Sequence, residues 1–409
     1  MKIVSQYLGL PKQVYILCIA RLVTAMGAFV YSFSSLFMTT VLNMSEVATG
    51  YMMVVFAVAS MVGAFVCGRL ADSFGRKRVF IVVMTLAVSA LFLGGFIIYS
   101  KLSLICMAVV SMSFSGVLPI VAAMITDNTD TSNRKESFSL MFMCINLGFA
   151  LGQVIAGRLF YNYTRWIFWG QGLGFFITLL MIIFFVKDKY VPGNSDVKSL
   201  DEVPKKKSNR KEFFSSVYKD KVLIVLLIVI VLTTFCYSQI SYMLPLDLTH
   251  TIGIENSANW VSNVWLLNGI FCVVWAPILL RISGKNNHIF NMAIASCLYA
   301  VGMGAYALIT DMSSVWIVII ATPLWTAGET LITTGTGVFI GGRAPENYRA
   351  AYQSLYEIAN SAGRCIGPVT MGYFLLASTY QTGWIMITAI ALACVIILLV
   401  TLRKEKRNE

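Results

Sequence analysis

The sequence predicts an all-helical integral membrane protein whose twelve transmembrane helices form two six-helix bundles. The chain is 58% hydrophobic and only 12% charged, with a mean hydropathy of +0.76, which is too apolar for a water-exposed surface. Its apolar runs are continuous and reach about 20 residues or more, as helices that cross a bilayer require. The two halves of the chain also share a residue pattern. We therefore expect lipid, rather than water, to surround most of the protein.

Six apolar runs make up the first half. The predicted spans are Val14–Val41, Val47–Cys67, Val79–Tyr99, Leu102–Thr126, Phe138–Tyr161 and Trp166–Val186. Lys2 and Lys12 precede the first span, and positive charge marks the cytoplasmic side, so we expect a cytoplasmic N-terminus. The first run is too long for a signal peptide, and we expect it to remain as a span.

A basic connection, Lys187–Lys221, separates the halves and contains ten Lys and Arg. We interpret it as a solvated cytoplasmic linker with room for a helix on the membrane surface. The second six spans are predicted at Val222–Leu246, Trp260–Leu280, Ile289–Thr310, Val315–Ile340, Ala351–Thr379 and Trp384–Leu402. The tail is basic, so the C-terminus is also expected in the cytoplasm. The predicted parts are bundle 1–186, linker 187–221 and bundle 222–409.

The halves repeat one another in their fifth spans. Each of five residues recurs 215 positions later: Arg134, Leu140, Gly148, Gly152 and Gly157 return as Arg349, Leu355, Gly363, Gly367 and Gly372. The repeat marks spans five and eleven as counterparts in two related halves.

Residues 68–78 carry a charged motif between the second and third spans, Gly-Arg-Leu-Ala-Asp-Ser-Phe-Gly-Arg-Lys-Arg. Two spans joined so closely need a sharp turn, which suits Gly68 and Gly75. The motif resembles the signature of the major facilitator superfamily, G-x-L-A-D-x-x-G-R-[KR]-[KR], and every specified position is filled. The resemblance implies the major facilitator fold and transport by alternating access. An ordinary positive-inside loop is the alternative, but it would need no Asp72.

The resemblance also implies a conformational latch. In relatives, the aspartate and first arginine of the motif pair with an acid at the end of the fourth span. The latch residues expected here are Gly68, Asp72, Gly75, Arg76, Lys77, Arg78 and Asp127. A latch is a two-state element whose ion pairs break when the bundles move. The alternative is a static surface cluster that contributes little.

The glycines of span five resemble a pattern of superfamily antiporters, G-x3-G-P-x3-G. Gln153 replaces the proline in Gly148-x3-Gly152-Gln153-x3-Gly157, whereas span eleven has it at Pro368. With Gly328-Glu329 in span ten, this resembles the twelve-helix multidrug branch, the drug:proton antiporters. The alternative is plain helix packing by small residues.

Charged residues within apolar spans are costly and usually face a cavity. Arg21, Glu329, Glu357 and Arg364 are therefore the expected residues for proton coupling or the substrate cavity. A carboxylate paired alternately with Arg364 or Arg21 can take up and release a proton. The alternative is a permanent buried ion pair that fixes helix register.

In relatives, spans one, four, seven and ten line the substrate pocket. The residues these spans offer are Met26, Tyr31, Phe33, Phe114, Tyr237, Tyr242 and Trp325. Aromatic and methionine side chains suit an adaptable apolar pocket, although each of them can instead pack within a bundle or face lipid.

The leading interpretation is a proton-coupled exporter of amphipathic or lipophilic small molecules. A symporter or facilitator for one metabolite is the first alternative, and a non-transporting sensor or scaffold on the same fold is the second. The sequence has no phosphate loop, nucleophile elbow or metal-ligand cluster, so we expect no enzyme, no metal and no cofactor, and an ion gradient, of protons, as the energy source.

The expected partners are a small-molecule substrate and the lipid bilayer. The net charge of +12 lies mostly on one side of the predicted topology, so we interpret it as orientation information and expect no nucleic acid. The nine cysteines fall in apolar spans without disulfide or metal spacing. We expect a monomeric, multi-pass protein of the bacterial cytoplasmic membrane.

Overall fold

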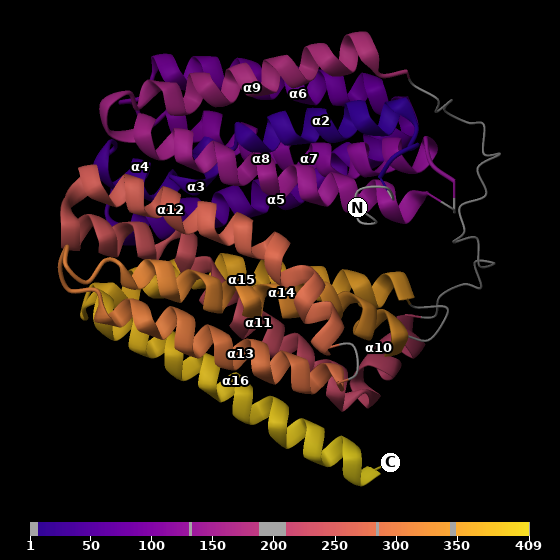
Figure 1. Cartoon of the computed structure of the whole chain (residues 1–409), viewed down its shortest axis with the longest axis vertical. Coiled ribbons are helices and arrows are strands. Elements are labelled where there is room, and N and C mark those ends of the chain that lie inside the picture. The colour runs from indigo at the N-terminus through magenta and orange to yellow at the C-terminus, as the bar shows by residue number, and fades with distance from the viewer. Residues whose placement is uncertain (1–6, 131–132, 188–209, 284–285, 344–348, 409) are drawn as a thin grey trace. The chain divides into compact units, whose positions relative to one another are not determined.

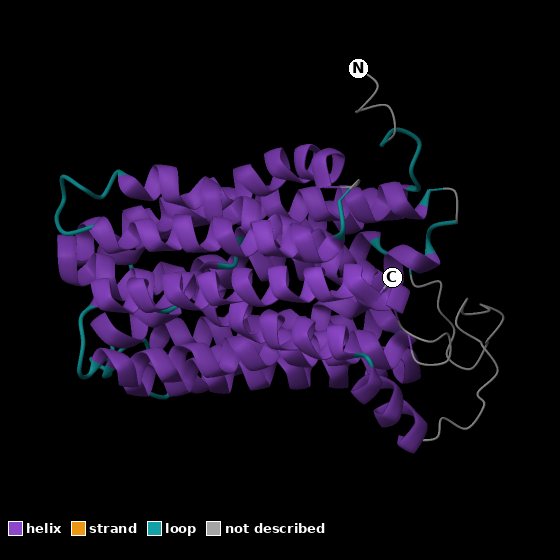
Figure 2. Ribbon diagram, turned by 90° about the horizontal axis from the view of Figure 1, so that it is seen from below, coloured by secondary structure: helices purple, strands orange, loops and turns teal. Residues whose placement is uncertain are grey.

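The computed structural model consists of helices and loops, with no strand in the part of the chain it describes (Figure 1, Figure 2). It describes residues 7–130, 133–187, 210–283, 286–343 and 349–408. The all-helical fold class is thereby confirmed. The number of spans and the side on which the termini lie stay predictions.

The described part of the first half of the chain contains eight helices. They are α2 Lys12–Met26, α3 Phe29–Ser32, α4 Ser34–Thr40, α5 Glu46–Phe74, α6 Arg76–Phe96, α7 Ser103–Asp127, α8 Arg134–Asn162 and α9 Arg165–Phe185. The first predicted span therefore consists of three consecutive helices, α2 to α4, rather than one.

In the second half, the described residues form seven α-helices and one short 3₁₀ helix, η1. They are α10 Arg210–Lys219, α11 Lys221–Ser241, α12 Met243–Ser283, α13 His288–Gly304, η1 Ala305–Leu308, α14 Ile317–Arg343, α15 Arg349–Leu375 and α16 Tyr380–Asn408. The 41-residue α12 is broken at Gly253, whose φ of 79° is not helical, so it joins the end of predicted span seven to span eight. Helix α10 lies in the predicted linker.

Ten stretches of the described chain are long and apolar enough to cross a membrane. One of them, Lys221–Ser283, covers both α11 and α12, so the ten stretches cover eleven of the twelve predicted spans. Helix α15 is not among them; it carries Glu357 and Arg364. We still expect α15 to cross the membrane, because it is the counterpart of α8 in the repeat.

The chain divides into two compact units. Unit 1 is Met1–Ser195 with Leu248–Ile270, and unit 2 is Asp196–Asp247 with Phe271–Glu409. Within unit 1, α2 packs mainly against α8 and α9, and α7 packs against α5 and α6. Within unit 2, α11 packs against α15, and α13 packs against α14 and α16. The domain boundaries that the sequence predicts differ from these units in the segment Leu248–Ile270, and they stay a prediction.

The repeated glycines bring helix backbones into direct contact. A Cβ atom built on Gly148 would lie 2.2 Å from Leu22 O of α2, and one on Gly152 would lie 2.0 Å from Met26 O. In unit 2, a Cβ on Gly363 would lie 2.4 Å from Val231 O of α11. No side chain fits between these backbones, so helix packing alone accounts for glycine at these positions.

Two glutamine side chains bridge the break between α2 and α3. Gln153 Nε2 of α8 donates to Ala28 O at 3.4 Å, and Val30 N donates to Gln171 Oε1 of α9 at 2.9 Å. Both glutamines are buried, and in lipid the backbone groups at a helix break need such partners. Gln153, which stands where antiporters have proline, therefore stabilises the interrupted first span.

The close approach of α8 to α2 predicts a strong effect of one methyl group. Gly152→Ala should lower the free energy of unfolding by about 1–3 kcal/mol, because the added carbon meets Met26 O and the backbones must separate. Gly174→Ala in α9 is the matched control, since its Cβ would lie at an ordinary 3.5 Å from Val23 O of the same helix α2. Thermal unfolding of the protein in detergent measures both; equal stability of the two variants would contradict the packing argument.

Candidate functional site

The signature motif is two helix ends rather than a loop. Helix α5 continues through the motif to Phe74, and α6 begins at Arg76. Gly75 alone makes the break, with a φ of 98° that favours glycine. The turn expected at Gly68 is therefore wrong: Gly68 is helical, and a Cβ there would only touch Pro119 at 3.8 Å. Helix α5 stays helical through Gly68 to Phe74, and the chain leaves the helix at Gly75.

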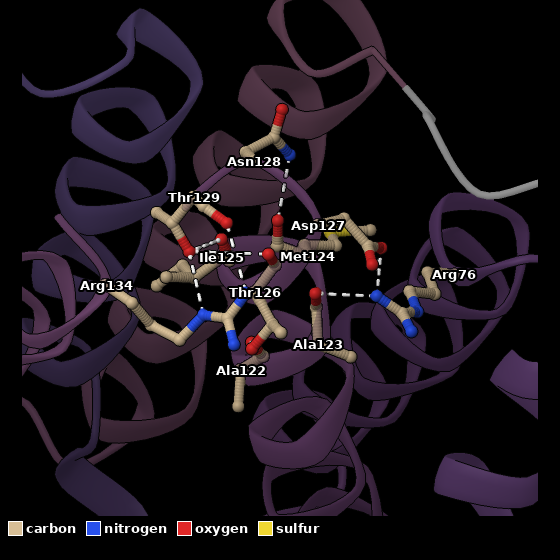
Figure 3. Close-up of polar contacts among 10 residues, drawn as sticks. All are labelled: Arg76, Ala122, Ala123, Met124, Ile125, Thr126, Asp127, Asn128, Thr129 and Arg134. Carbon is tan, nitrogen blue, oxygen red and sulfur yellow. Dashed lines mark hydrogen bonds and ion pairs between the residues drawn. The ribbon is translucent and has the colours of Figure 1, made fainter. Parts of the chain in front are cut away.

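Arg76 joins the start of α6 to the end of α7. It forms an ion pair with Asp127, the last residue of α7, and its Nη1 atom also donates to Ala123 O at 2.6 Å (Figure 3). The Arg76 and Asp127 side chains are only 13% and 11% exposed. Shielding from water makes this pair stronger than an exposed surface ion pair.

A second arginine reaches the end of α7 from the other side. Arg134, the first residue of α8, donates from Nη2 to Thr129 O at 3.1 Å. Figure 3 shows Arg76 and Arg134 on opposite sides of this helix end. A cation at the start of its own helix is unfavourable, whereas near the carboxyl end of a neighbouring helix it is favourable. Both arginines gain by extending to α7.

Lys77 makes a similar contact with α9. Its Nζ donates to Ile183 O at 2.8 Å and to Val186 O at 2.7 Å, which caps the carboxyl end of that helix. Asp72 and Arg78 are exposed. The structure therefore joins Arg76, Lys77 and Asp127 of the predicted latch to the ends of α7 and α9, and places Asp72 and Arg78 on the surface.

Arg21 is a buried charge without a carboxylate partner in the described chain. Its side chain is 2% exposed, and its Nη1 has no hydrogen-bond partner. The guanidinium lies 5.7 Å from the centroid of the Phe114 ring. An arginine at membrane depth costs at least about 2.5–3.5 kcal/mol, and a cation–π contact offsets only about 0.5–2 kcal/mol of that. The charge is thus incompletely compensated.

Glu329 lies in α14 beside α12 and α13. Its Oε2 atom is 4.0 Å from Cys272 Sγ. Gly328 brings α14 close to α13, because a Cβ there would lie 2.8 Å from Tyr299 Cδ1. The buried Tyr299 is within electrostatic range of both Glu329 and Arg364. In unit 2, a carboxylate (Glu329) and a guanidinium (Arg364) therefore both act electrostatically on one buried phenol (Tyr299).

Arg364 and Glu357 lie on the exposed parts of α15. Arg364 extends over Tyr237 of α11, with 5.7 Å between its Cζ and the ring centroid. Tyr237 in turn meets Trp325 edge-on, at 6.0 Å between centroids. Arg364 thus belongs to the group around Tyr299 and Glu329, whereas no contact described here places Glu357 in it.

The predicted pocket residues have different environments. Met26, Phe114 and Tyr237 are half-buried, and Tyr31 is 47% exposed. Phe33, Tyr242 and Trp325 are fully buried. Phe33 stacks on Phe160, and Trp325 Nε1 donates to Tyr306 OH at 2.9 Å, so these two side chains serve packing in this conformation.

Comparison with known proteins identifies the family. The sequence profile of the Major Facilitator Superfamily matches residues 17–368, which is most of the chain. The chain belongs to the Major Facilitator Superfamily. It is therefore a multi-pass membrane transporter.

The relatives of this transporter are distant. It is 20% identical over 360 residues to the Na(+), Li(+), K(+)/H(+) antiporter of Planococcus maritimus, covering 82% of each chain. It is 24% identical over 217 residues to Multidrug resistance protein 1 of Bacillus subtilis, covering 53% of each. The solved structure of the nucleoside transporter NupG matches this chain with a TM-score of 0.77 and 13% sequence identity. The match covers 95% of this chain and 99% of the NupG chain, and it shows that the two share a fold.

The structure also shows an ion-pair cluster in unit 2 that the sequence analysis missed. Arg343, the last residue of α14, contacts Asp220 Oδ2 from Nε at 3.1 Å and Glu405 Oε1 from Nη1 at 2.8 Å. Asp220 is the N-cap residue of α11, and Glu405 lies near the end of α16. The three residues come from three separate helix ends, so no local sequence pattern reveals the cluster.

Three further polar residues that the sequence analysis did not single out have defined environments in the structure. Asp247 is buried and accepts a hydrogen bond from Trp384 Nε1 at 2.7 Å. His250 lies in α12, and His288 is the first residue of α13. His288 stacks on Phe339, at 4.8 Å between centroids, because Gly335 leaves room for its ring.

The shielded ion pair predicts coupling between Arg76 and Asp127. In a double-mutant cycle with Arg76→Gln and Asp127→Asn, the unfolding free energies should show a coupling of about 1–3 kcal/mol, because each variant removes the same contact. The control cycle pairs Arg78→Gln with Asp127→Asn, and should be additive because Arg78 is exposed. A cycle of Arg76 and Asp127 as additive as the control would show that the pair contributes nothing.

Asp220 has two roles that two substitutions can separate. Its carboxylate binds Arg343 and also accepts from Leu223 N at 3.0 Å, as the N-cap of α11. Asp220→Asn removes the charge but keeps a capping oxygen, whereas Asp220→Ala removes both. We expect Asp220→Ala to be less stable than Asp220→Asn by about 1 kcal/mol in thermal unfolding, the usual effect of a lost cap. Equal melting temperatures of the two variants would mean that the cap does not contribute to stability.

Proposed function

We propose that this transporter exports amphipathic or lipophilic small molecules in exchange for protons, by alternating access. The observation that carries the proposal is the position of Glu329. It is a partly buried carboxylate in the middle of α14, next to Cys272 Sγ, and both it and Arg364 are within electrostatic range of the buried Tyr299.

Such a carboxyl group can serve as the proton carrier. Apolar surroundings favour its neutral form, and the approach of a cation favours its charged form. Arg364 is the cation that shares the environment of Tyr299 with it. A movement that changes the distance between Glu329 and Arg364 would therefore change the protonation of Glu329.

Two observations support a proton gradient as the energy source in this proposal. No phosphate-binding loop for ATP is present in the sequence. One relative is named as an antiporter that uses protons, and another as a multidrug resistance protein. The first name favours coupling to protons, and the second favours a range of drugs over one metabolite.

The contacts of Arg76 would supply the conformational latch. They join α6 to the end of α7 through one shielded ion pair and one carbonyl. An ion pair of this kind forms or breaks as a whole, which suits a two-state element. In this proposal it holds one of the two states of the transport cycle.

Replacing Glu329 tests the proposal. The assay uses vesicles with an imposed pH gradient and a pH-sensitive dye inside. The wild type should move protons when compounds from a panel of lipophilic cations, anions and neutral molecules are added. Glu329→Gln should abolish this flux, because the amide cannot carry a proton. Glu255→Gln, at an exposed position of α12, is the matched control and should retain it.

Two outcomes would contradict the proposal. Proton flux retained by Glu329→Gln would remove this residue from the coupling. A wild type that responds to no compound of the panel, but takes up one metabolite saturably, would establish the metabolite carrier instead.

A further inference from the structure

Unit 1 contains a buried cation that the proposed exchange of protons does not use. Arg21 lies in α2, fully buried, with an unpartnered Nη1 and the ring of Phe114 beside it. In a membrane protein, a charge kept at such cost is usually functional.

The described part of unit 1 offers this cation no carboxylate. Its acids lie at helix ends or in loops and connections: Glu46, Asp72, Asp127, Asp130, Glu136 and Glu255. Glu136 is the nearest in sequence to the part of α8 that faces Arg21, but it precedes Gly148, the neighbour of Leu22, by twelve residues, or about 18 Å of helix. Among the described residues of unit 1, none therefore supplies an anion that neutralises Arg21.

The surroundings of Arg21 suit an organic anion better than an inorganic one. Phe114 stacks on the buried Phe175, at 6.1 Å between ring centroids, so the cation lies next to an aromatic pair. Phe114 is itself only half-buried. An apolar body can lie against the ring while an oxyanion accepts hydrogen bonds from the guanidinium.

We propose that Arg21 and Phe114 form the binding site for the anionic group of an amphipathic carboxylate, which makes such carboxylates the substrate class of this transporter. The planar guanidinium presents paired N–H groups that match the two oxygens of a carboxylate. Phe114 binds the apolar part. The inference that these ligands are transported rests on the proposed function, whereas their binding does not.

The test measures binding by the purified full chain in detergent, without a gradient. The probes are dansylglycine, its neutral methyl ester and the cationic dansyl ethylenediamine, which share one fluorophore. The wild type should bind dansylglycine at least about tenfold more tightly than the other two, since a charge-assisted hydrogen bond contributes about that factor. Arg21→Gln should lose this preference, and Arg21→Lys should keep part of it because it keeps the charge.

Arg158→Gln is the matched control, because Arg158 is an exposed arginine in α8 of the same unit. It should bind all three probes like the wild type. Without any probe, Arg21→Gln should melt no lower than the wild type, because an uncompensated buried charge is removed. A marked fall in melting temperature would show instead that Arg21 has a structural partner, and would overturn the proposal.

Two further results would also overturn it: a wild type that does not prefer dansylglycine, and an Arg21→Gln variant that keeps the preference. The vesicle assay of Glu329→Gln distinguishes a failure of this site from a failure of the proposed exchange. Preferential binding of dansylglycine without proton flux leaves the site in place and removes the coupling. Proton flux without that preference removes the site alone.

Discussion

The fold depends on the exclusion of water from the membrane interior. There, each polar group needs a partner within the protein or a ligand. The break between α2 and α3 shows the constraint at the level of the backbone: Ala28 and Val30 obtain their hydrogen bonds from the buried Gln153 and Gln171. The same constraint gives meaning to charged side chains, because a charge that is buried without a partner requires an explanation.

The charged groups of the two units follow this rule in different ways. At the helix ends, arginines lie against carboxylates and carbonyls of neighbouring helices, as Arg76 does with Asp127 and Arg343 does with Asp220. The side chains of these ion pairs are partly shielded from water. Each pair links two helices, so the helices can move apart only if the ion pair breaks. Arg21 is the exception, since its only contact described is with an aromatic ring.

The fold class was predictable because hydropathy alone identifies helices in lipid, and the family because the signature motif is filled. The details were less so. The sequence places a turn at Gly68, but an α-helix tolerates glycine, and only the positive φ of Gly75 breaks the chain. The cluster of Arg343, Asp220 and Glu405 joins residues more than 60 positions apart, which no local pattern shows. The exposure of Glu357 likewise depends on how α15 faces its neighbours.

The charge of Arg21 also bears on which compounds the transporter can accept. A cation held at low dielectric repels a lipophilic cation more strongly than it would in water, because nothing screens it. A substrate pocket that included unit 1 near α2 would therefore discriminate against cationic drugs, although the fifth-span glycines resemble those of multidrug antiporters. These glycines are explained by the contact of α8 with Leu22 and Met26. Packing motifs of this kind describe how the bundle is built, and in the proposal made here the buried charge is what selects the substrate.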